Sequence, residues 1–327
     1  MLSESDVDAD LIRQRRIAII GYGNQGRAHA LNLRDSGCEI RAGARPGGAG
    51  WERAVQDGID VQSIEQVAAW ADLVSILVPD QYHREVFTHR IAPSLQIGDL
   101  LLVAHGFSIL YGEIRPPNGV DVALVAPVGP GEMLRTLFLQ GSGIPAVLAV
   151  HQDSSGLAGE IALSYAGALG CARVGVQRST FAEETVTDLF GEQAILCGGL
   201  PALALAGFDT LVDAGYQPEL AYLECIHQLK LIVDLIYARG IPGMRDAISD
   251  TARFGAYRAA PTVVDDHVRQ SLQSVLKRIQ DGTFAREWIA EARSGAPAMH
   301  EQQARERQSQ AERIGAGLRG LMRSTDL

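Results

Sequence analysis

The stretch IAIIGYGNQGRAHALNL, residues 17–33, decides the fold of this chain. Its first four residues are apolar and predict a short buried strand, and the residues from Arg27 to Leu33 predict a helix. The motif between them consists of Gly21, Tyr22, Gly23, Asn24, Gln25 and Gly26. The glycines permit a tight turn and a close approach of the backbone to a pyrophosphate, whose charge the helix N-terminus stabilises. In this context the motif predicts dinucleotide binding rather than a purely structural turn.

Short apolar segments alternate with helical segments from Arg16 to about Phe181. The predicted strands are Ile17–Ile20, Cys38–Ala42, Leu73–Leu77, Leu100–Ala104, Asp121–Ala126, Ala146–Ala149 and Ala172–Val176. This alternation is typical of an α/β fold with a doubly wound parallel sheet. The pattern therefore predicts that the first part of the chain is a Rossmann domain.

From Glu183 onward the strand pattern disappears and helical periodicity dominates. Helices are predicted over 184–197, 200–214, 218–238, 262–280 and 283–293, with a polar helix from about 298. We therefore predict two domains, a Rossmann dinucleotide-binding domain over 1–182 and an all-α domain over 183–327. The second would carry the metal and substrate sites and the dimer contacts.

The choice of cofactor depends on the end of the second predicted strand. An acidic residue there would hold the ribose hydroxyls of NAD, whereas a basic residue accommodates the 2′-phosphate of NADP. The sequence at this point is Gly43-Ala44-Arg45-Pro46, without an acid. Arg45 therefore favours NADP(H), with an ordinary surface arginine as the alternative.

Two pairs of polar residues, Asp188/Glu192 and Glu224/Gln228, are each spaced four residues apart in predicted helices. Residues at this spacing share one helix face, so each pair can direct oxygen atoms into one cleft. Apolar neighbours predict that both helices are largely buried, and buried carboxylates need cations or dense hydrogen bonding to stay ionised. The pattern indicates a Mg²⁺ site, although such pairs also occur on solvated helix faces.

The composition narrows the class of partner and the compartment. A formal net charge of −10 argues against nucleic acid and anionic membranes as main partners. The four cysteines show no metal-binding spacing, the N-terminus lacks the apolar core of a signal peptide, and no apolar run suggests a membrane span. We expect a cytoplasmic protein that acts on small molecules.

Longer motifs extend this interpretation. They are GYGNQGRAHALNLRDSG, VPDQ, AHGFSI, APVGPG, VHQD, TDLFGEQAILCGG, LIVDLIY and GMRDAISDTA. Together they resemble the ketol-acid reductoisomerases of branched-chain amino-acid synthesis, in particular the short, class I form, over about residues 15–325. The resemblance implies a Rossmann domain, an all-helical knotted C-terminal domain and a homodimer whose active sites draw on both chains. It also implies NADPH and two Mg²⁺ ions, which serve alkyl migration and then reduction of a 2-oxo acid.

The resemblance also assigns roles to individual residues. The implied cofactor contacts are Tyr22, Gly23, Asn24, Gln25, Arg45, Asp80 and Gly131. The implied active-site residues are His105, the metal ligands Asp188, Glu192 and Glu224, and Ser249 for the substrate carboxylate. We expect His105 near the nicotinamide and Glu224 in catalysis as well as metal binding.

The chain departs from the family pattern at several positions. Gln228 stands where a glutamate is usual, Val128 where a lysine is usual, and Gly48 and Gly50 where two phosphate-binding serines are usual. The residues after His105, Gly-Phe-Ser-Ile-Leu, lack the usual asparagine and second histidine. Loss of the serines weakens the preference for NADP(H), so NAD(H) stays open.

These departures affect alkyl migration more than reduction. An amide is a poorer Mg²⁺ ligand than a carboxylate, and valine cannot replace the positive charge of lysine. We therefore predict an NAD(P)H- and Mg²⁺-dependent reductase of a small 2-oxo-acid-like substrate, with weakened or lost alkyl migration. The alternatives are a complete ketol-acid reductoisomerase and a non-catalytic dinucleotide-binding paralogue.

Overall fold

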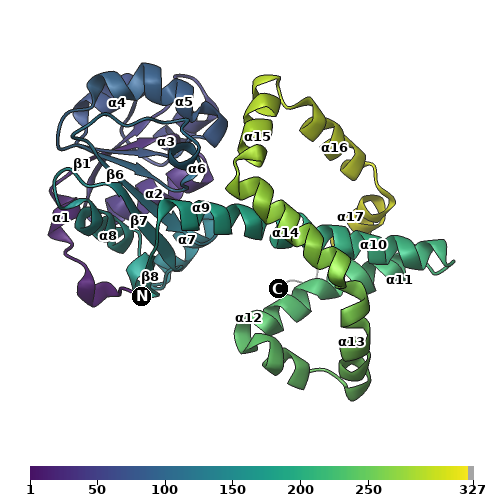
Figure 1. The fold of residues 1–327 in the computed structure, drawn as a ribbon. Coiled ribbons are helices and arrows are strands. Elements are labelled where there is room, and N and C mark those ends of the chain that lie inside the picture. Colours follow the sequence, from purple (N-terminus) through teal and green to yellow (C-terminus); the bar gives the residue numbers. More distant parts are fainter. Residues whose placement is uncertain (323–327) are drawn as a thin grey trace. The chain divides into compact units, whose positions relative to one another are not determined.

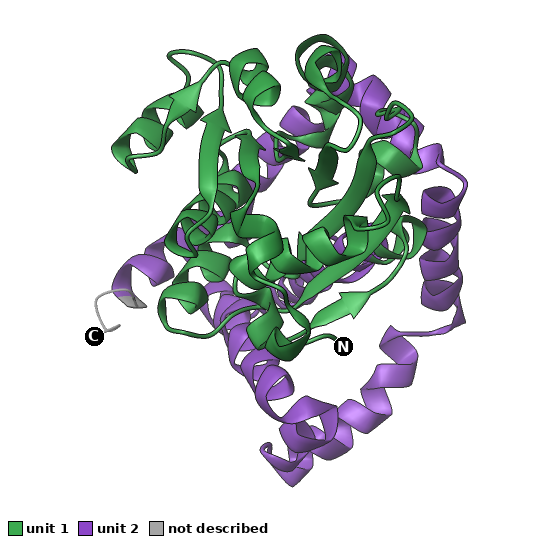
Figure 2. Ribbon diagram, turned by 90° about the vertical axis from the view of Figure 1, so that its left-hand side faces the viewer, with its two compact units in different colours: residues 1–187 green, residues 188–327 purple. Residues whose placement is uncertain are grey.

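The computed structural model describes residues 1–322. The chain divides into two compact units, Met1–Thr187 and Asp188–Leu327, which Figure 2 shows in green and purple. This division falls within helix α9 (Phe181–Phe190), near whose start the sequence places the domain boundary. The boundary at 182/183 stays a prediction.

The first unit is built on one eight-stranded sheet with the order β3-β2-β1-β4-β5-β6-β7-β8 (Figure 1). The strands are β1 (Arg16–Ile20), β2 (Glu39–Gly43), β3 (Val61–Gln62), β4 (Leu73–Ile76), β5 (Leu100–Val103), β6 (Asp121–Pro127), β7 (Ala146–Gln152) and β8 (Val176–Arg178). From β3 to β6, neighbouring strands in this order are parallel. The predicted doubly wound parallel sheet is confirmed for this part.

The edge of the sheet beyond β6 differs from the expectation. Strands β6 and β7 pair antiparallel, and β8 then pairs parallel with β7. Hydrophobic pattern cannot reveal this, because a strand buried on both faces reads alike in either direction. The predicted strand Ala172–Val176 is wrong over most of its length. Cys171–Arg173 forms a 3₁₀ turn, and Gly175 at φ 141° keeps the backbone out of the extended conformation until Val176.

Helices cover both faces of this sheet. One core cluster joins α2 (Asn24–Asp35) and α8 (Ala158–Ala168) to Ile17 and Ile19 of β1. The other cluster joins α4 (Ile64–Trp70) to Ala18 and Ile20. Successive side chains of a strand point to opposite faces, so β1 alone contributes to both clusters. The remaining helices of this unit are α1 (Asp10–Arg13), α3 (Ala49–Gln56), α5 (His83–Val86), α6 (Phe107–Leu110) and α7 (Gly131–Leu139).

The second unit is helical throughout its described residues, as the sequence predicts. After α9 and the π-helical η6 (Gly191–Leu196) come α10 (Gly199–Asp213), α11 (Pro218–Tyr222), π-helical η7 (Leu223–His227), α12 (Gln228–Asp246), α13 (Asp250–Val263), α14 (Asp266–Gln280), α15 (Thr283–Arg293), α16 (Pro297–Arg307) and α17 (Gln310–Met322). Sequence reasoning missed α13, whose residues include Gly255 and Pro261 and none that is buried. It also merged α16 and α17 into one polar helix.

One helical stretch is long and apolar enough to cross a membrane by length and composition alone. It runs from Phe181 to Asp213, with a mean hydropathy of 1.7 over its most apolar window, of which 6% is buried. The expectation that no apolar run approaches a membrane span is therefore too strict. A single such helix is weak evidence for a membrane, and this one also carries Asp188 and Glu192.

Candidate active site

A cleft of about 720 Å³ lies in the first unit where β1, β2 and β4 end. The strand order reverses between β1 and β4, which is where doubly wound sheets bind their ligands. The predicted cofactor residues that line this cleft are Gly21, Tyr22, Gly23, Asn24, Gln25 and Arg45. The cleft therefore combines the predicted phosphate loop with the predicted ribose-binding residue.

The glycines of the motif are required by close backbone packing. Gly21 has φ 100°, and a Cβ there would lie 2.8 Å from the backbone nitrogen of Val78. A Cβ at Gly26 would lie 1.9 Å from the carbonyl oxygen of Gly21. Gly23 precedes α2 without a side-chain cap, so the first N–H groups of this helix can bind a phosphate.

A hydrogen-bonded network holds Tyr22 in place within the motif. The buried Tyr22 hydroxyl donates to Asp57 at 3.0 Å, and the guanidinium of Arg27 bonds both oxygens of Asp57 at 2.7 and 2.8 Å. Arg27 lowers the pKa of Asp57, whereas burial and the neighbouring Asp57 raise the pKa of Tyr22. Tyr22 therefore stays a neutral donor that ties the phosphate loop to the end of α3.

The loop after β6 packs directly against the motif. Gln25 Nε2 donates to the carbonyl oxygen of Gly129 at 3.0 Å, and a Cβ at Gly131 would lie 2.3 Å from the carbonyl oxygen of Asn24. Gly131 is therefore a packing residue beside the cofactor loop and does not line the cleft itself. Val128 of the same loop is 59% exposed.

Basic residues gather at the ribose end of the cleft. Arg45 and Arg53 line it, and neither forms an ion pair with the described carboxylates. Arg53 Nη1 donates to the carbonyl oxygen of Tyr22 at 3.4 Å. A Cβ at Gly48 would lie 3.1 Å from the carbonyl oxygen of Arg45, so the backbone packs closely at this glycine. In an acidic chain this end of the cleft suits an anion.

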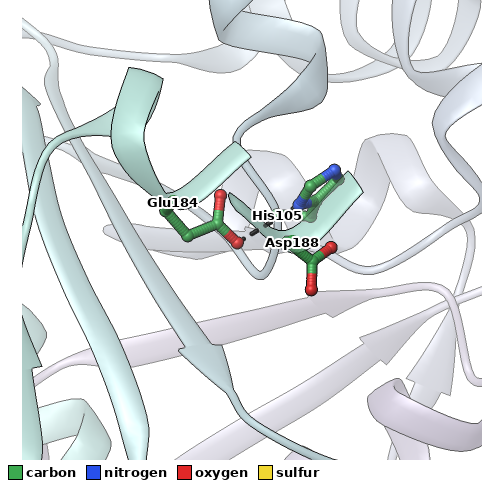
Figure 3. Close-up of side chains that lie close together, drawn as sticks. All are labelled: His105, Glu184 and Asp188. Atoms are coloured by element: carbon green, nitrogen blue, oxygen red, sulfur yellow. Dashed lines mark hydrogen bonds and ion pairs between the residues drawn. The ribbon is translucent and has the colours of Figure 1, made fainter. Parts of the chain in front are cut away.

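A second group of polar residues consists of His105, which follows β5, and of Glu184 and Asp188 in α9 (Figure 3). Glu184 and Asp188 lie one turn apart on α9, and the three residues offer ligand atoms that all lie within 4.8 Å of one another. His105 Nδ1 and Glu184 Oε1 are 3.2 Å apart. The set of one imidazole and two carboxylates is able to hold a divalent cation.

Glu184 is largely occupied by its neighbours. It is 5% exposed, and its Oε2 accepts hydrogen bonds from Gly106 N–H at 3.0 Å and Thr185 Oγ1 at 3.2 Å. A Cβ at Gly106 would lie 2.2 Å from Thr185 Oγ1, so this glycine permits the close contact. Glu184 therefore orients His105 and its loop, while Asp188 is the exposed carboxylate of the group. Sequence reasoning missed Glu184, although its position one turn before Asp188 is a usable indication.

The other predicted site residues lie elsewhere in the described chain and outside this group. Asp80 precedes α5, with Oδ1 3.7 Å from His83 Nε2, and does not line the cleft. Glu192 lies in η6 and Glu224 in η7, both exposed. Such π-helical turns are rare in proteins, and those that occur are often found at functional sites. Ser249 caps α13 by accepting the N–H of Ala252 at 3.2 Å.

The prediction that the acid-bearing helices are buried is wrong for the isolated chain. Asp188, Glu192, Glu224 and Gln228 are all exposed. So are apolar neighbours such as Ile195 and Leu231, at 49% and 53%. The apolar faces exist as expected, but a single copy of these helices does not cover them. Gln228 Nε2 donates to Glu224 Oε2 at 2.7 Å, which confirms that these two side chains share a helix face.

Comparison with known families accounts for nearly the whole chain. Residues 11–175 match the family model described as acetohydroxy acid isomeroreductase, NADPH-binding domain. Residues 181–324 match the model described as ketol-acid reductoisomerase, C-terminal domain. The chain belongs to the ketol-acid reductoisomerase family.

Individual members of the ketol-acid reductoisomerase family are similar over their full length. A ketol-acid reductoisomerase (NADP(+)) from Saccharopolyspora erythraea is 50% identical over 319 residues, covering 98% of this chain and 96% of that protein. An NADH-preferring ketol-acid reductoisomerase of known structure, from an uncultured archaeon, is 41% identical with a TM-score of 0.95, covering 98% of each chain. The chain is therefore an NAD(P)H-dependent oxidoreductase of ketol-acid reductoisomerase type.

More distant structures share the fold alone. A semialdehyde dehydrogenase NAD-binding protein from Cupriavidus necator matches with a TM-score of 0.63 and 20% identity, covering 82% of this chain and 99% of that one. This likeness confirms a Rossmann-type unit followed by helices, without information on the reaction.

Proposed function

We propose that this ketol-acid reductoisomerase homologue is a cytoplasmic, homodimeric enzyme that reduces a small 2-oxo acid with NADPH and Mg²⁺, with weak or absent alkyl migration. The observation that carries the proposal is the pairing of Gln228 with Glu224 at 2.7 Å. A neutral amide occupies the position where the family pattern has a second carboxylate. The net negative charge of this helix face is reduced accordingly, and with it the affinity for a second divalent cation.

Val128 supports the proposal independently. Its side chain is 59% exposed, beside the cofactor loop, where the family pattern has a lysine. Valine offers neither positive charge nor a hydrogen-bond donor. A lysine that would stabilise developing negative charge, and a carboxylate that would hold a cation with the same effect, are thus replaced by neutral groups on two different elements.

The two half-reactions make different demands on these groups. Alkyl migration builds charge on one oxygen while a neighbouring carbonyl is polarised, so it depends strongly on the surrounding positive charge. Hydride transfer requires an aligned nicotinamide, one polarised carbonyl and a proton source. The replacements at 128 and 228 therefore weaken migration first.

We assign the remaining roles as follows. Asp188, Glu192 and Glu224 are exposed carboxylates, the type of ligand that Mg²⁺ prefers, so we assign them as its ligands. A bound cation would polarise the substrate oxygen. His105, oriented by Glu184, lines the nicotinamide side, and Ser249 binds the substrate carboxylate.

NADPH is the favoured cofactor in this proposal, with NADH as the alternative. Arg45 is exposed at the ribose end of the cleft, without an ion-pair partner among the described carboxylates, and Arg53 lies at the same end. The absence of an acid after β2 argues in the same direction. The names of the two similar relatives give different cofactors: NADP(+) for the Saccharopolyspora erythraea protein and a preference for NADH for the archaeal protein.

The exposed apolar residues of the helical unit support the proposed homodimer. Tyr237 and Ile241 of α12 are 93% and 60% exposed, and Leu203 of α10 is 56% exposed. A monomer seldom leaves so many large apolar side chains in water. We infer that a second copy of the chain covers them and brings Glu224 and Ser249 into a shared active site.

The test compares two substrates for the same enzyme. Oxidation of NADPH and NADH is measured with 2-acetolactate, which requires migration, and with 3-hydroxy-3-methyl-2-oxobutyrate, which requires reduction only. We expect the second to be turned over at least about tenfold faster in the presence of Mg²⁺. The double variant Val128→Lys/Gln228→Glu should gain more activity on 2-acetolactate than the two single variants combined, since both groups act on one transition state.

The control places a lysine elsewhere on the first unit. Val174 is 50% exposed and lies outside the cleft, so Val174→Lys should leave both activities unchanged. Efficient conversion of 2-acetolactate by the unaltered protein would make it a complete reductoisomerase. Absence of NAD(P)H oxidation with either acid would instead favour the non-catalytic alternative.

A further inference from the structure

His83 is a buried histidine that the proposed chemistry does not use. It lies in α5, is 3% exposed, and both of its ring nitrogens are engaged. Nε2 lies 2.7 Å from the carbonyl oxygen of Val78, and Nδ1 lies 2.7 Å from Ser108 Oγ. Ser108 is itself fully buried in α6.

The chemistry of the partners fixes the protonation of the ring. A carbonyl oxygen only accepts, so Nε2 carries the proton and donates to Val78. Burial lowers the pKa of His83, so Nδ1 has no proton and accepts from the Ser108 hydroxyl. The nearby Asp80 Oδ1, 3.7 Å from Nε2, lies beyond good hydrogen-bond distance. The neutral ring thus donates to the Val78 backbone in the loop after β4 and accepts from the Ser108 side chain in α6.

The two partners belong to two different segments of the first unit, the loop after β4 and helix α6 after β5. Val78 lines the cofactor cleft and packs under Gly21, where a Cβ would lie 2.8 Å from the Val78 backbone nitrogen. Ser108 lies in the first turn of α6, three residues after His105. Its carbonyl oxygen also accepts the N–H of Ile114 at 2.8 Å, which anchors the end of the same segment.

We propose that His83 and Ser108 form a positioning pair that fixes His105 relative to the floor of the cofactor cleft. The pair connects the loop after β4 with the loop after β5, and these strands are neighbours in the sheet. Hydride transfer depends steeply on such alignment, since an error of about 1 Å can cost about 100-fold in rate. Neither residue lines the cofactor cleft, so both would act through the segments they join.

The alternative is that the pair only stabilises the fold. Removing the hydroxyl of Ser108 leaves a buried acceptor on His83 without a partner, which destabilises a protein whatever its function. Loss of stability therefore cannot distinguish the two roles. The decisive quantities are the rate of hydride transfer and the environment of the bound nicotinamide in the folded enzyme.

The experiment compares Ser108→Ala, His83→Leu and His83→Gln in the full-length protein. Glutamine retains a donor for Val78 and an acceptor for Ser108, whereas leucine retains neither. Ser164→Ala is the matched control, since Ser164 is another fully buried serine of this unit whose Oγ accepts the N–H of Ile12 at 3.2 Å and donates to the carbonyl oxygen of Asp8. It does not line the cofactor cleft.

Each variant is measured with NADPH and 3-hydroxy-3-methyl-2-oxobutyrate, and with NADPH alone. We expect Ser108→Ala and His83→Leu to lower kcat about tenfold, with KM for NADPH changed less than about threefold. The fluorescence of bound NADPH should shift, and the isotope effect with deuterated NADPH should rise. His83→Gln should recover most of kcat, and Ser164→Ala should lose thermal stability only.

Several results would overturn the proposal. One is a kcat within twofold of the unaltered enzyme for Ser108→Ala, with unchanged fluorescence of bound NADPH. Another is a His83→Gln variant no better than His83→Leu, or an equal loss of kcat in Ser164→Ala. If His83→Leu does not fold, Ser108→Ala carries the test. The fluorescence of bound NADPH requires no turnover, so a failed substrate assignment remains distinguishable from a failed positioning role.

Discussion

The first unit buries its large apolar side chains, whereas the second leaves many of them in water. Around the sheet, residues such as Ile19, Leu101 and Tyr165 are fully buried. In the helical unit, Tyr237 and Phe254 are 93% and 71% exposed. One chain therefore buries the apolar residues around the sheet by itself, while the helical unit leaves apolar surface in water that the proposed dimer would cover.

The largest effect should come from placing charge on the exposed apolar face. Tyr237→Glu/Ile241→Glu would bury two carboxylates in the proposed dimer contact, which is strongly unfavourable. We expect a monomer in light scattering at micromolar concentration and a loss of turnover of about 100-fold or more, because a shared site would be incomplete. NADPH affinity should change little, since the cleft lies in the first unit.

Ile97→Glu provides the matched control. Ile97 is 88% exposed, like Tyr237, but belongs to the first unit. It should change neither mass nor turnover. A monomeric and fully active Tyr237→Glu/Ile241→Glu variant would show that the contrast between the units has no bearing on the active site.

A smaller effect should follow from removing the guanidinium of Arg45. A hydrogen bond to a charged group contributes about 1.5–3 kcal/mol, which corresponds to about 10- to 100-fold in affinity. Arg45→Gln should weaken NADPH by this factor and NADH less than about threefold, as measured by fluorescence titration. Arg90 lines the same cleft but pairs with Glu65 at 3.3 Å, so Arg90→Gln should not change the ratio between the cofactors. Equal losses for both cofactors in Arg45→Gln would remove Arg45 from the 2′-phosphate site.

The sequence predicts the first unit better than the second, and for a physical reason. A strand, a glycine motif and a helix in immediate succession are local features, and the structure has them in this order: β1 ends at Ile20 as expected, and α2 begins at Asn24, three residues before the predicted start. The direction of β7 and the position of β8 depend on contacts between distant segments. Apolar pattern alone does not encode such contacts.

The candidate site shows the same contrast between local features, which the sequence predicts, and contacts between distant segments, which it does not. The residues of the phosphate loop could be predicted because the glycines are demanded by backbone packing. Glu184 could not be recognised from its type alone, because its role depends on the loop that brings Gly106 to it at 3.0 Å. The burial of Glu224 was misjudged because apolar neighbours indicate that a helix will be covered, but not whether its own chain covers it.

The smallest predicted effect concerns His29 in the core of the first unit and the dependence of stability on pH. This histidine is fully buried, its Nδ1 lies 2.8 Å from the Tyr165 hydroxyl, and its Nε2 has no hydrogen-bond partner among the described residues. Burial lowers the pKa of His29 to about 3. The unfolded chain therefore takes up a proton as pH falls below about 6.5, while the folded chain does not until about pH 3, so stability is lost on acidification through this range. Between pH 7 and pH 5 this loss should be on the order of 2 kcal/mol, measured by urea unfolding.

His29→Gln should flatten this dependence of stability on pH, and His89→Gln, at an exposed position of the same unit, should preserve it. An unchanged slope in His29→Gln would mean that other groups govern the acid sensitivity of this core.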